Sequence, residues 1–316
     1  MVQVEGLTIT YGSLVAVRDV SFHVGPGEVL GLVGPNGAGK TSIAESVGGL
    51  RDPVGSGSIS VCGFDPRRER KAVSRLIGMQ LQESQFPSRA RVGELCDLYE
   101  AIYAAPGAAA RLLETFGLAG RRRSLISELS GGMRQRLALA LAQVGDVRLV
   151  VLDELTTGLD PEQRRGTWHA VLALAERGVA VLLTSHSMDE VAALCTRVGV
   201  LLDGELVALD SPARLTATHG GPSTISFDPD ADPGIEQRLE ALGLTRLPGG
   251  TDRRVEYEAR RPTDYDRVLR QLVEAGLPPS AVTRRTPSFE DAYLRLVGVG
   301  SDGAGTDRTV SDKGGV

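Results

Sequence analysis

Short apolar runs rich in β-branched residues alternate with longer helical stretches over the first two thirds of the chain. This alternation is typical of a mainly parallel sheet covered by helices. The runs predict strands at residues 2–9, 15–24, 28–34, 57–62, 76–80, 149–153, 180–184 and 198–202. Only glycine turns, at Tyr11-Gly12-Ser13 and Gly25-Pro26-Gly27, separate the amino-terminal strands, so we expect these strands to be antiparallel.

The pattern changes twice further along. From residue 91 to 143 the strand signal stops and Leu, Ala, Arg and Glu dominate, which predicts an inserted helical subdomain. After Pro212 the order is strand 223–227, helix 234–242, strands 244–247 and 253–259, helix 263–275, strand 281–285 and a last helix at 288–297. This order, βαββαβ, is compatible with a small split-βαβ domain.

These patterns predict three parts: an α/β domain at 1–218, a small α+β domain at 219–298, and a disordered tail at 299–316 in which Gly, Ser, Asp and Thr dominate. The 316 residues are 41% hydrophobic, as in a soluble globular chain. With 40 acidic and 35 basic residues the net charge is −5, which argues against nucleic acid as the main partner.

We expect a cytoplasmic protein that does not itself cross a membrane. Its start has no signal-peptide pattern, and its apolar runs are far shorter than the ~18 residues that a span needs. The three cysteines, Cys62, Cys96 and Cys195, are odd in number and far apart, so neither a disulfide framework nor a zinc site is indicated.

The strongest motif for chemistry lies between a predicted strand and a predicted helix. It matches G-x-x-x-x-G-K-[ST] with Gly34, Pro35, Asn36, Gly37, Ala38, Gly39, Lys40 and Thr41, and Ser42 follows. Glycines let successive backbone N–H groups point at phosphate oxygens, at the positive end of the next helix. Lys40 would reach the β- and γ-phosphates, and the Thr41 hydroxyl would ligate Mg²⁺. The motif therefore predicts a nucleoside triphosphate with Mg²⁺.

Two carboxylates end the buried strand at 149–153. Asp153 could hold Mg²⁺ through water, and Glu154 could polarise the attacking water. A similar run at 198–202 ends in Asp203-Gly204, which is typical of a hairpin turn, so we favour the first pair.

A second phosphate-binding surface is predicted at Leu129, Ser130, Gly131, Gly132 and Met133, because a serine and two glycines at a helix start expose a hydroxyl and N–H groups. With this motif, residues 2–218 closely resemble the ATP-binding subunit of an ABC transporter. The resemblance implies a P-loop NTPase cassette with a mixed-sheet core, an antiparallel β subdomain and a helical subdomain at about 91–143.

The resemblance also implies individual roles. Tyr11 would stack on adenine, and His186 would hydrogen-bond the γ-phosphate. Gln82 would contact Mg²⁺ and the catalytic water and face the membrane partner, with Gln80 as the competing choice. Gly158, Leu159 and Asp160 match the loop that crosses the dimer interface, called the D-loop.

One residue departs from the family pattern. Leu155 follows Glu154 where the family usually has proline. A leucine frees an N–H and removes a fixed φ, so we expect an altered rate and retained activity.

In the family the signature serine caps the nucleotide of a partner chain. The resemblance therefore implies a homodimer or a heterodimer of cassettes, joined head to tail by two ATP molecules, with a separate membrane permease. Segments 207–212 and 287–294 resemble subunits that pair with ABC-2 type permeases, including daunorubicin-type drug exporters. We thus expect an ATPase on the inner face of the plasma membrane that powers export of a drug, an antibiotic-like metabolite or a lipid.

Two other function classes stay open from the sequence. A soluble ABC ATPase of chromosomes or ribosomes would need long coiled-coil insertions or a second cassette, and we find neither pattern. A binding module without catalysis is disfavoured by the presence of Lys40, Glu154 and His186 together.

Overall fold

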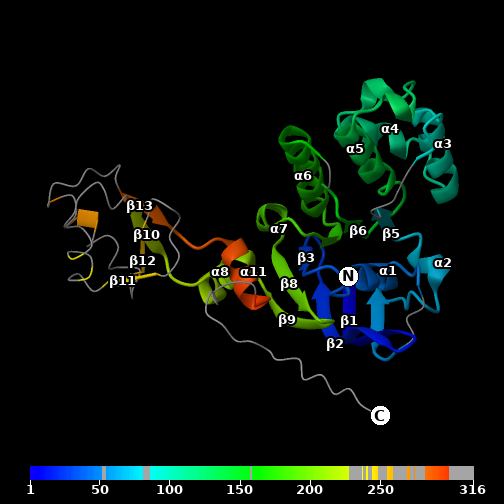
Figure 1. Cartoon of the computed structure of the whole chain (residues 1–316). Helices are drawn as coiled ribbons and strands as arrows, with labels where there is room; N and C mark the ends of the chain where they lie inside the picture. Colours follow the sequence, from blue (N-terminus) through cyan, green and yellow to red (C-terminus); the bar gives the residue numbers. More distant parts are fainter. Residues whose placement is uncertain are drawn as a thin grey trace, which may run out of the picture. The chain divides into compact units, whose positions relative to one another are not determined.

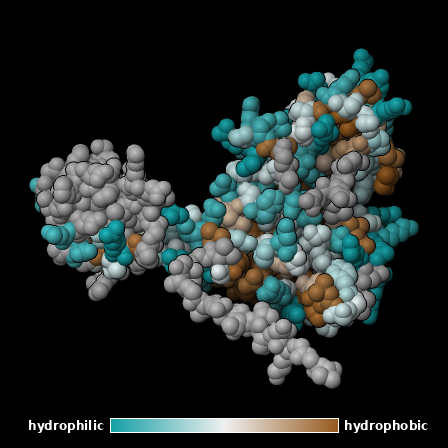
Figure 2. Space-filling model, in the orientation of Figure 1, coloured by the Kyte–Doolittle hydropathy of each residue, from teal (hydrophilic) through white to brown (hydrophobic). Residues whose placement is uncertain are grey.

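The computed structural model describes residues 1–51, 55–80, 86–156 and 159–227, and beyond them 237, 240, 244–247, 255–258, 269–270, 274 and 282–298. The chain forms two compact units, Met1–Leu215 and Thr216–Val316. Where Figure 2 colours the surface by hydropathy, hydrophilic residues dominate and apolar residues form small separate patches. No helix among the described residues is long and apolar enough to cross a bilayer.

The first unit is built around a six-stranded sheet (Figure 1), in the order β5 (Ile77–Gln80), β6 (Leu149–Asp153), β7 (Ala180–Thr184), β3 (Val29–Val33), β8 (Arg197–Leu202) and β9 (Glu205–Asp210). Neighbouring strands are parallel except β8 and β9. All residues of β3, β6 and β7 are buried, as expected for parallel strands covered on both faces. The carboxyl ends of β3, β6 and β7 therefore share one edge, where the predicted phosphate loop and both carboxylates lie.

A second sheet in this unit has the order β2 (Leu14–Val24), β1 (Val2–Tyr11) and β4 (Ser58–Val61), and its pairs are antiparallel. The antiparallel pairing expected around Gly12 is thus confirmed. The one expected around Gly25-Pro26-Gly27 is wrong, because β3 leaves this sheet and pairs in parallel with β7 and β8. Since β3 is apolar on both faces, a central place in the covered sheet buries it more completely than a hairpin with one wet face.

One hydrophobic core joins both sheets to helix α1 (Lys40–Val47). Val4 and Ile9 of β1, Leu30 and Leu32 of β3, and Ile43 of α1 belong to the same buried cluster. The phosphate loop is consequently fixed at both ends, by β3 before it and by α1 after it.

Helices fill the stretch where the strand signal stopped, as expected. They are α3 (Val92–Tyr103), α4 (Ala108–Thr115) and α5 (Gly131–Leu141), with 3₁₀ turns at Ala119–Arg121 and Ile126–Glu128. Helix α5 packs beside α6 (Pro161–Glu176), and the unit also contains α2 (Arg70–Val73) and α7 (Met188–Leu194).

The second unit contains an antiparallel sheet in the order β11 (Thr245–Arg246), β12 (Val255–Glu258), β10 (Thr224–Phe227) and β13 (Val282–Arg285), followed by α11 (Phe289–Leu296). Helix α8 (Pro212–His219) precedes it. With β12 between β11 and β10, the order is that of a split-βαβ sheet. The predicted helices 234–242 and 263–275 lie mostly outside the described residues, and the predicted tail lies wholly outside them.

Candidate nucleotide-binding site

The phosphate loop connects β3 to α1 and leaves the helix start open. The loop needs glycine at position 39, where φ is 97° and a Cβ would lie 2.6 Å from the carbonyl oxygen of Ala16. Gly39 is also the N-cap of α1, and it has no side chain with which to cap the first N–H groups. Such a helix N-terminus can bind an anion.

The Lys40 ammonium folds back onto the loop that precedes it. Nζ donates to the carbonyl oxygens of Gly34 at 2.8 Å and Pro35 at 3.0 Å, and the side chain is buried. Burial lowers the Lys40 pKa, while the nearby Glu154 and Asp153 carboxylates oppose this effect. The structure thus brings Asp153, at the end of β6, and Glu154, directly after it, into the electrostatic field of Lys40.

Asp153 and Glu154 have different surroundings. Asp153 is buried at the end of β6 and accepts a hydrogen bond from the Thr184 hydroxyl of β7. Glu154 has φ of 52°, in the left-handed region, while its N–H still donates to the Thr184 carbonyl oxygen at 3.0 Å. Backbone strain of this kind at a non-glycine residue is typical of functional sites.

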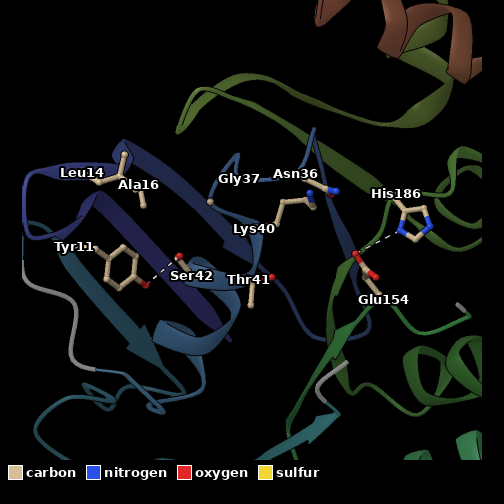
Figure 3. Close-up of a pocket in the computed structure, with 11 residues that line it drawn as sticks. Tyr11, Leu14, Ala16, Asn36, Gly37, Lys40, Thr41, Ser42, Glu154 and His186 are labelled. Atoms are coloured by element: carbon tan, nitrogen blue, oxygen red, sulfur yellow. Dashed lines mark hydrogen bonds and ion pairs between the residues drawn. The ribbon is translucent and has the colours of Figure 1, made fainter. Parts of the chain in front are cut away.

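His186 lies beside Glu154, just beyond β7. The distance from His186 Nδ1 to Glu154 Oε1 is 3.5 Å, and the His186 side chain is exposed. The pair faces the same pocket as Lys40, as Figure 3 shows. A carboxylate next to an imidazole can accept a proton from water that reaches the pocket.

This pocket has a volume of about 700 Å³ and opens beside the β1–β2 hairpin. Tyr11 ends β1, and its hydroxyl donates to Ser42 Oγ at 3.1 Å. The Arg51 guanidinium carbon lies 5.7 Å from the centre of the Tyr11 ring, within cation–π range. The pocket is lined by Tyr11, Leu14, Ala16, Asn36, Gly37, Gly39, Lys40, Thr41, Ser42, Glu154 and His186.

Leu14 and Ala16 were missed in the sequence. Leu14 is the cross-strand partner of Tyr11, and it is 64% exposed, unusual for leucine. The signal was available in the hairpin itself, because the residue paired with Tyr11 across the Gly12-Ser13 turn must lie next to it.

The signature residues 129–133 lie outside this pocket. Ser130 is the N-cap of α5, and its Oγ accepts from the Met133 N–H at 3.2 Å, so the predicted helix start is present. The Gly132 N–H donates to Oε1 of Gln163, on α6, at 2.8 Å. Leu129 is buried.

The predicted D-loop runs into α6. Asp160 is the N-cap of this helix and accepts from the Gln163 N–H at 2.8 Å. Leu159 lies against the signature turn, since a Cβ built on Gly131 would be 3.5 Å from Leu159 Cδ2. Gly158 is outside the described residues.

Leu155, at the position where the family usually has proline, is fully buried, and its carbonyl oxygen accepts from the Gln135 amide of α5. Gln135 and Gln163 were not singled out in the sequence. Their partners are 20 and 31 residues away along the chain, so no local pattern marks them.

Asp203 and Gln80, the competing choices from the sequence, do not line the pocket that contains Lys40. Asp203 lies in the β8–β9 turn with φ of 50°, so the hairpin interpretation is confirmed. Gln82 is outside the described residues. Gln80, on β5, is buried in a separate cavity of about 250 Å³, and among the described residues its Oε1 has no hydrogen-bond partner.

The donor set fits Mg²⁺. Thr41 supplies a hydroxyl at the start of α1, and Asp153 supplies a carboxylate. Mg²⁺ at nucleotide sites commonly takes one or two protein oxygens and completes its shell with phosphate and water oxygens.

The chain is similar to known proteins in sequence and in fold. A family model described as "ABC transporter" matches residues 17–157. The "Nod factor export ATP-binding protein I" of Paraburkholderia xenovorans (strain LB400) is 36% identical over 92% of this chain and 94% of the relative. The "Daunorubicin resistance ATP-binding protein DrrA3" of Streptomyces coeruleorubidus is 33% identical over 94% of this chain and 96% of the relative. The solved "Structure of ATP binding subunit of ABC transporter" has a TM-score of 0.63 at 24% identity, covering 70% of this chain and 93% of that one.

Proposed function

The chain belongs to the ATP-binding subunits of ABC transporters, and from this premise we propose that it hydrolyses ATP to drive export of a small molecule through a separate membrane permease. The observation that carries the proposal is the Glu154–His186 pair, 3.5 Å apart, in one pocket with Lys40. A chain that only bound nucleotide would not need a base and an imidazole there.

Nucleotide binding begins with Lys40. Its ammonium would leave the carbonyl oxygens of Gly34 and Pro35 for the β- and γ-phosphates, while the N–H groups at the start of α1 bind phosphate oxygens. Tyr11 and Leu14 would hold the adenine ring of the nucleotide between an aromatic and an aliphatic side chain. Thr41 and Asp153 would hold Mg²⁺, which would neutralise part of the phosphate charge.

Hydrolysis needs one proton transfer at the pocket. Glu154 accepts the proton of the attacking water as the water oxygen bonds to the γ-phosphorus, and the bond to the ADP oxygen breaks. His186 donates a hydrogen bond to the γ-phosphate and is oriented by Glu154. Lys40 stabilises the charge that develops on the ADP side.

We propose that two cassettes share each nucleotide. The signature turn lies outside the pocket of its own chain and presents the N-terminus of α5. A head-to-tail pair would place this turn against the phosphates held by the partner, with ATP stabilising the pair and hydrolysis releasing it.

Export is supported by the relatives, whose printed names refer to Nod factor export and to daunorubicin resistance. Helix α3 offers a surface for the permease, because Leu98 is 51% and Ile102 is 63% exposed. We propose an ABC-2 type permease as the partner and a drug, an antibiotic-like metabolite or a lipid as the exported molecule.

The decisive experiment uses Glu154→Gln, which removes the base and keeps the shape of the site. We expect turnover to fall about 10²- to 10⁴-fold, and ATP to convert the purified variant from monomer to dimer in light scattering. A variant that stays monomeric at saturating ATP would contradict the paired mechanism.

The permease is tested by co-purification with a multi-span membrane protein encoded beside this chain. Leu98→Asp with Ile102→Asp should abolish capture, whereas Leu172→Asp, an exposed apolar position on α6, should preserve it. Equal capture by all three proteins would remove α3 from the docking surface.

A further inference from the structure

The start of α5 makes a contact that the proposed mechanism does not use. The Gly132 N–H donates to Gln163 Oε1 at 2.8 Å, and Gln163 belongs to another helix. We propose that Gln163 is a latch: within the single chain its side-chain oxygen takes the place of a phosphate oxygen, and it must leave Gly132 before the pair can close. This inference rests on the proposed head-to-tail pair.

The fit between the two residues is close. A Cβ built on Gly132 would lie 2.8 Å from both Cβ and Cγ of Gln163, and one on Gly131 would lie 3.7 Å from Gln163 Oε1. The side chain of Gln163 therefore lies across both signature glycines. Gly132 is buried although it belongs to a turn that, in the proposed pair, must reach a nucleotide.

The neighbouring N–H groups are also occupied. The Met133 N–H donates to Ser130 Oγ at 3.2 Å, and the Arg134 N–H donates to the Ser130 carbonyl oxygen at 2.9 Å. Those two bonds lie within one helical turn and resemble an ordinary N-cap. The bond from Gly132 differs, because breaking it requires a side chain of α6 to move.

The latch residue Gln163 is hydrogen-bonded to a residue of the D-loop. The Gln163 N–H donates to Asp160 Oδ1 at 2.8 Å, so the latch residue lies in the first turn after the D-loop. Leu159 of the same loop lies against Gly131. A partner chain that displaces the D-loop would therefore move Gln163 as well, which couples contact between the chains to exposure of the Gly132 N–H.

Charge explains why ATP can open the latch. The γ-phosphate group is ionised, and charge-assisted hydrogen bonds are roughly twice as strong as neutral ones. A helix N-terminus also favours negative charge. Phosphate should therefore replace the neutral carboxamide, while the carboxamide sets how much ATP is needed.

The test compares two substitutions with opposite expected effects, both in the Glu154→Gln background. Gln163→Leu removes the acceptor, so half-maximal dimerisation should need less ATP, by about 2- to 12-fold, the range for one neutral hydrogen bond. Gln163→Glu places a charged acceptor on the same N–H and repels phosphate, so more ATP should be needed. Dimer formation is followed by analytical ultracentrifugation over an ATP series.

The outcomes separate the latch from the function on which it rests. Both variants shifting in the same direction, or neither shifting, would overturn the latch while the pair stands. A Glu154→Gln parent that never dimerises would overturn the pair and the latch together. If Gln163→Leu does not fold, Gln163→Met removes the same acceptor with an unbranched chain.

A binding control is available in the monomer. Gln163 is outside the pocket of its own chain, so the affinity of monomeric protein for a fluorescent ATP analogue should stay within about twofold in both variants. A larger change in this affinity would show that position 163 acts on the phosphate loop and would refute the latch.

Discussion

Two helix starts in the first unit are both suited to binding phosphate, and they are prepared in different ways. At α1 the N-cap is Gly39, which offers no side chain, and Lys40 adds a positive charge beside the open N–H groups. At α5 the Ser130 hydroxyl and the Gln163 carboxamide already occupy the N–H groups. The start of α1 can bind a nucleotide directly. The start of α5 must first give up hydrogen bonds within the chain in exchange for hydrogen bonds to a phosphate.

This difference suggests a division of work between the two sites. The open start would give the single chain its affinity for ATP. The occupied start would contribute only when a second chain brings its own nucleotide. Substitutions at α1 should therefore affect binding by the monomer, and substitutions at α5 should affect only the steps that need two chains.

The largest effect is expected at the open start. Lys40→Ala removes the charge that faces the phosphates, and we expect turnover at background and monomer affinity for ATP weaker by about 100-fold. Isothermal titration with ATP would measure the affinity of the monomer, and a phosphate-release assay would measure turnover. Retained activity would remove the phosphate loop from its role.

The occupied start should respond differently. Ser130→Ala should lower turnover by about 10- to 100-fold and leave monomer affinity for ATP unchanged. Loss of the N-cap should cost about 1 kcal/mol of stability, visible as a slightly lower melting temperature. A parallel loss of monomer affinity would break the comparison.

The Tyr11 ring and its hydroxyl can be separated. Tyr11→Ala should weaken ATP binding about tenfold, because a stacked base is worth about 1–3 kcal/mol. Tyr11→Phe keeps the ring and loses only the hydrogen bond to Ser42, so its effect should stay within about threefold. Equal losses in the two variants would mean that the hydroxyl, and not the ring, holds the nucleotide.

The smallest effect concerns pH. Burial lowers the pKa of Lys40 below 10.5, so between the folded and the unfolded pKa the unfolded chain binds more protons and stability rises with pH. Relative to Lys40→Met, the nucleotide-free parent should therefore gain stability as pH rises toward 10.5. Melting temperatures of the parent and of Lys40→Met over a pH series would show this gain in stability. Melting temperatures that change with pH in the same way for both proteins would contradict the prediction.

The sequence predicted the covered sheet well because its strands are continuous apolar runs. The runs at 149–153 and 180–184 match β6 and β7 residue for residue. It failed at the turn before β3, where a glycine turn looks the same whether the chain reverses within one sheet or passes to another. β9 was missed although its residues 206–209 are all apolar and directly follow the predicted Asp203-Gly204 turn.

At the candidate site, contiguous motifs were readable and tertiary contacts were not. Lys40 and Glu154 belong to local sequence motifs that indicate their chemistry, and the structure brings both residues to one pocket. Gln163 carries no such pattern, because its contact depends on how α6 packs against α5. Leu14 lies between these cases, since it follows from a hairpin that was itself predicted.

The hairpin turn between β8 and β9 has a consequence for how this protein tolerates change. Gly204 has φ of 84°, and a Cβ there would lie 2.9 Å from the Ala16 carbonyl oxygen, the same atom that a Cβ at Gly39 would meet. The Gly204 carbonyl oxygen also accepts a hydrogen bond from the Arg18 N–H at 2.8 Å. Selection should therefore hold position 204 to glycine as strictly as a position of the phosphate loop, although it lies 164 residues along the chain from Lys40.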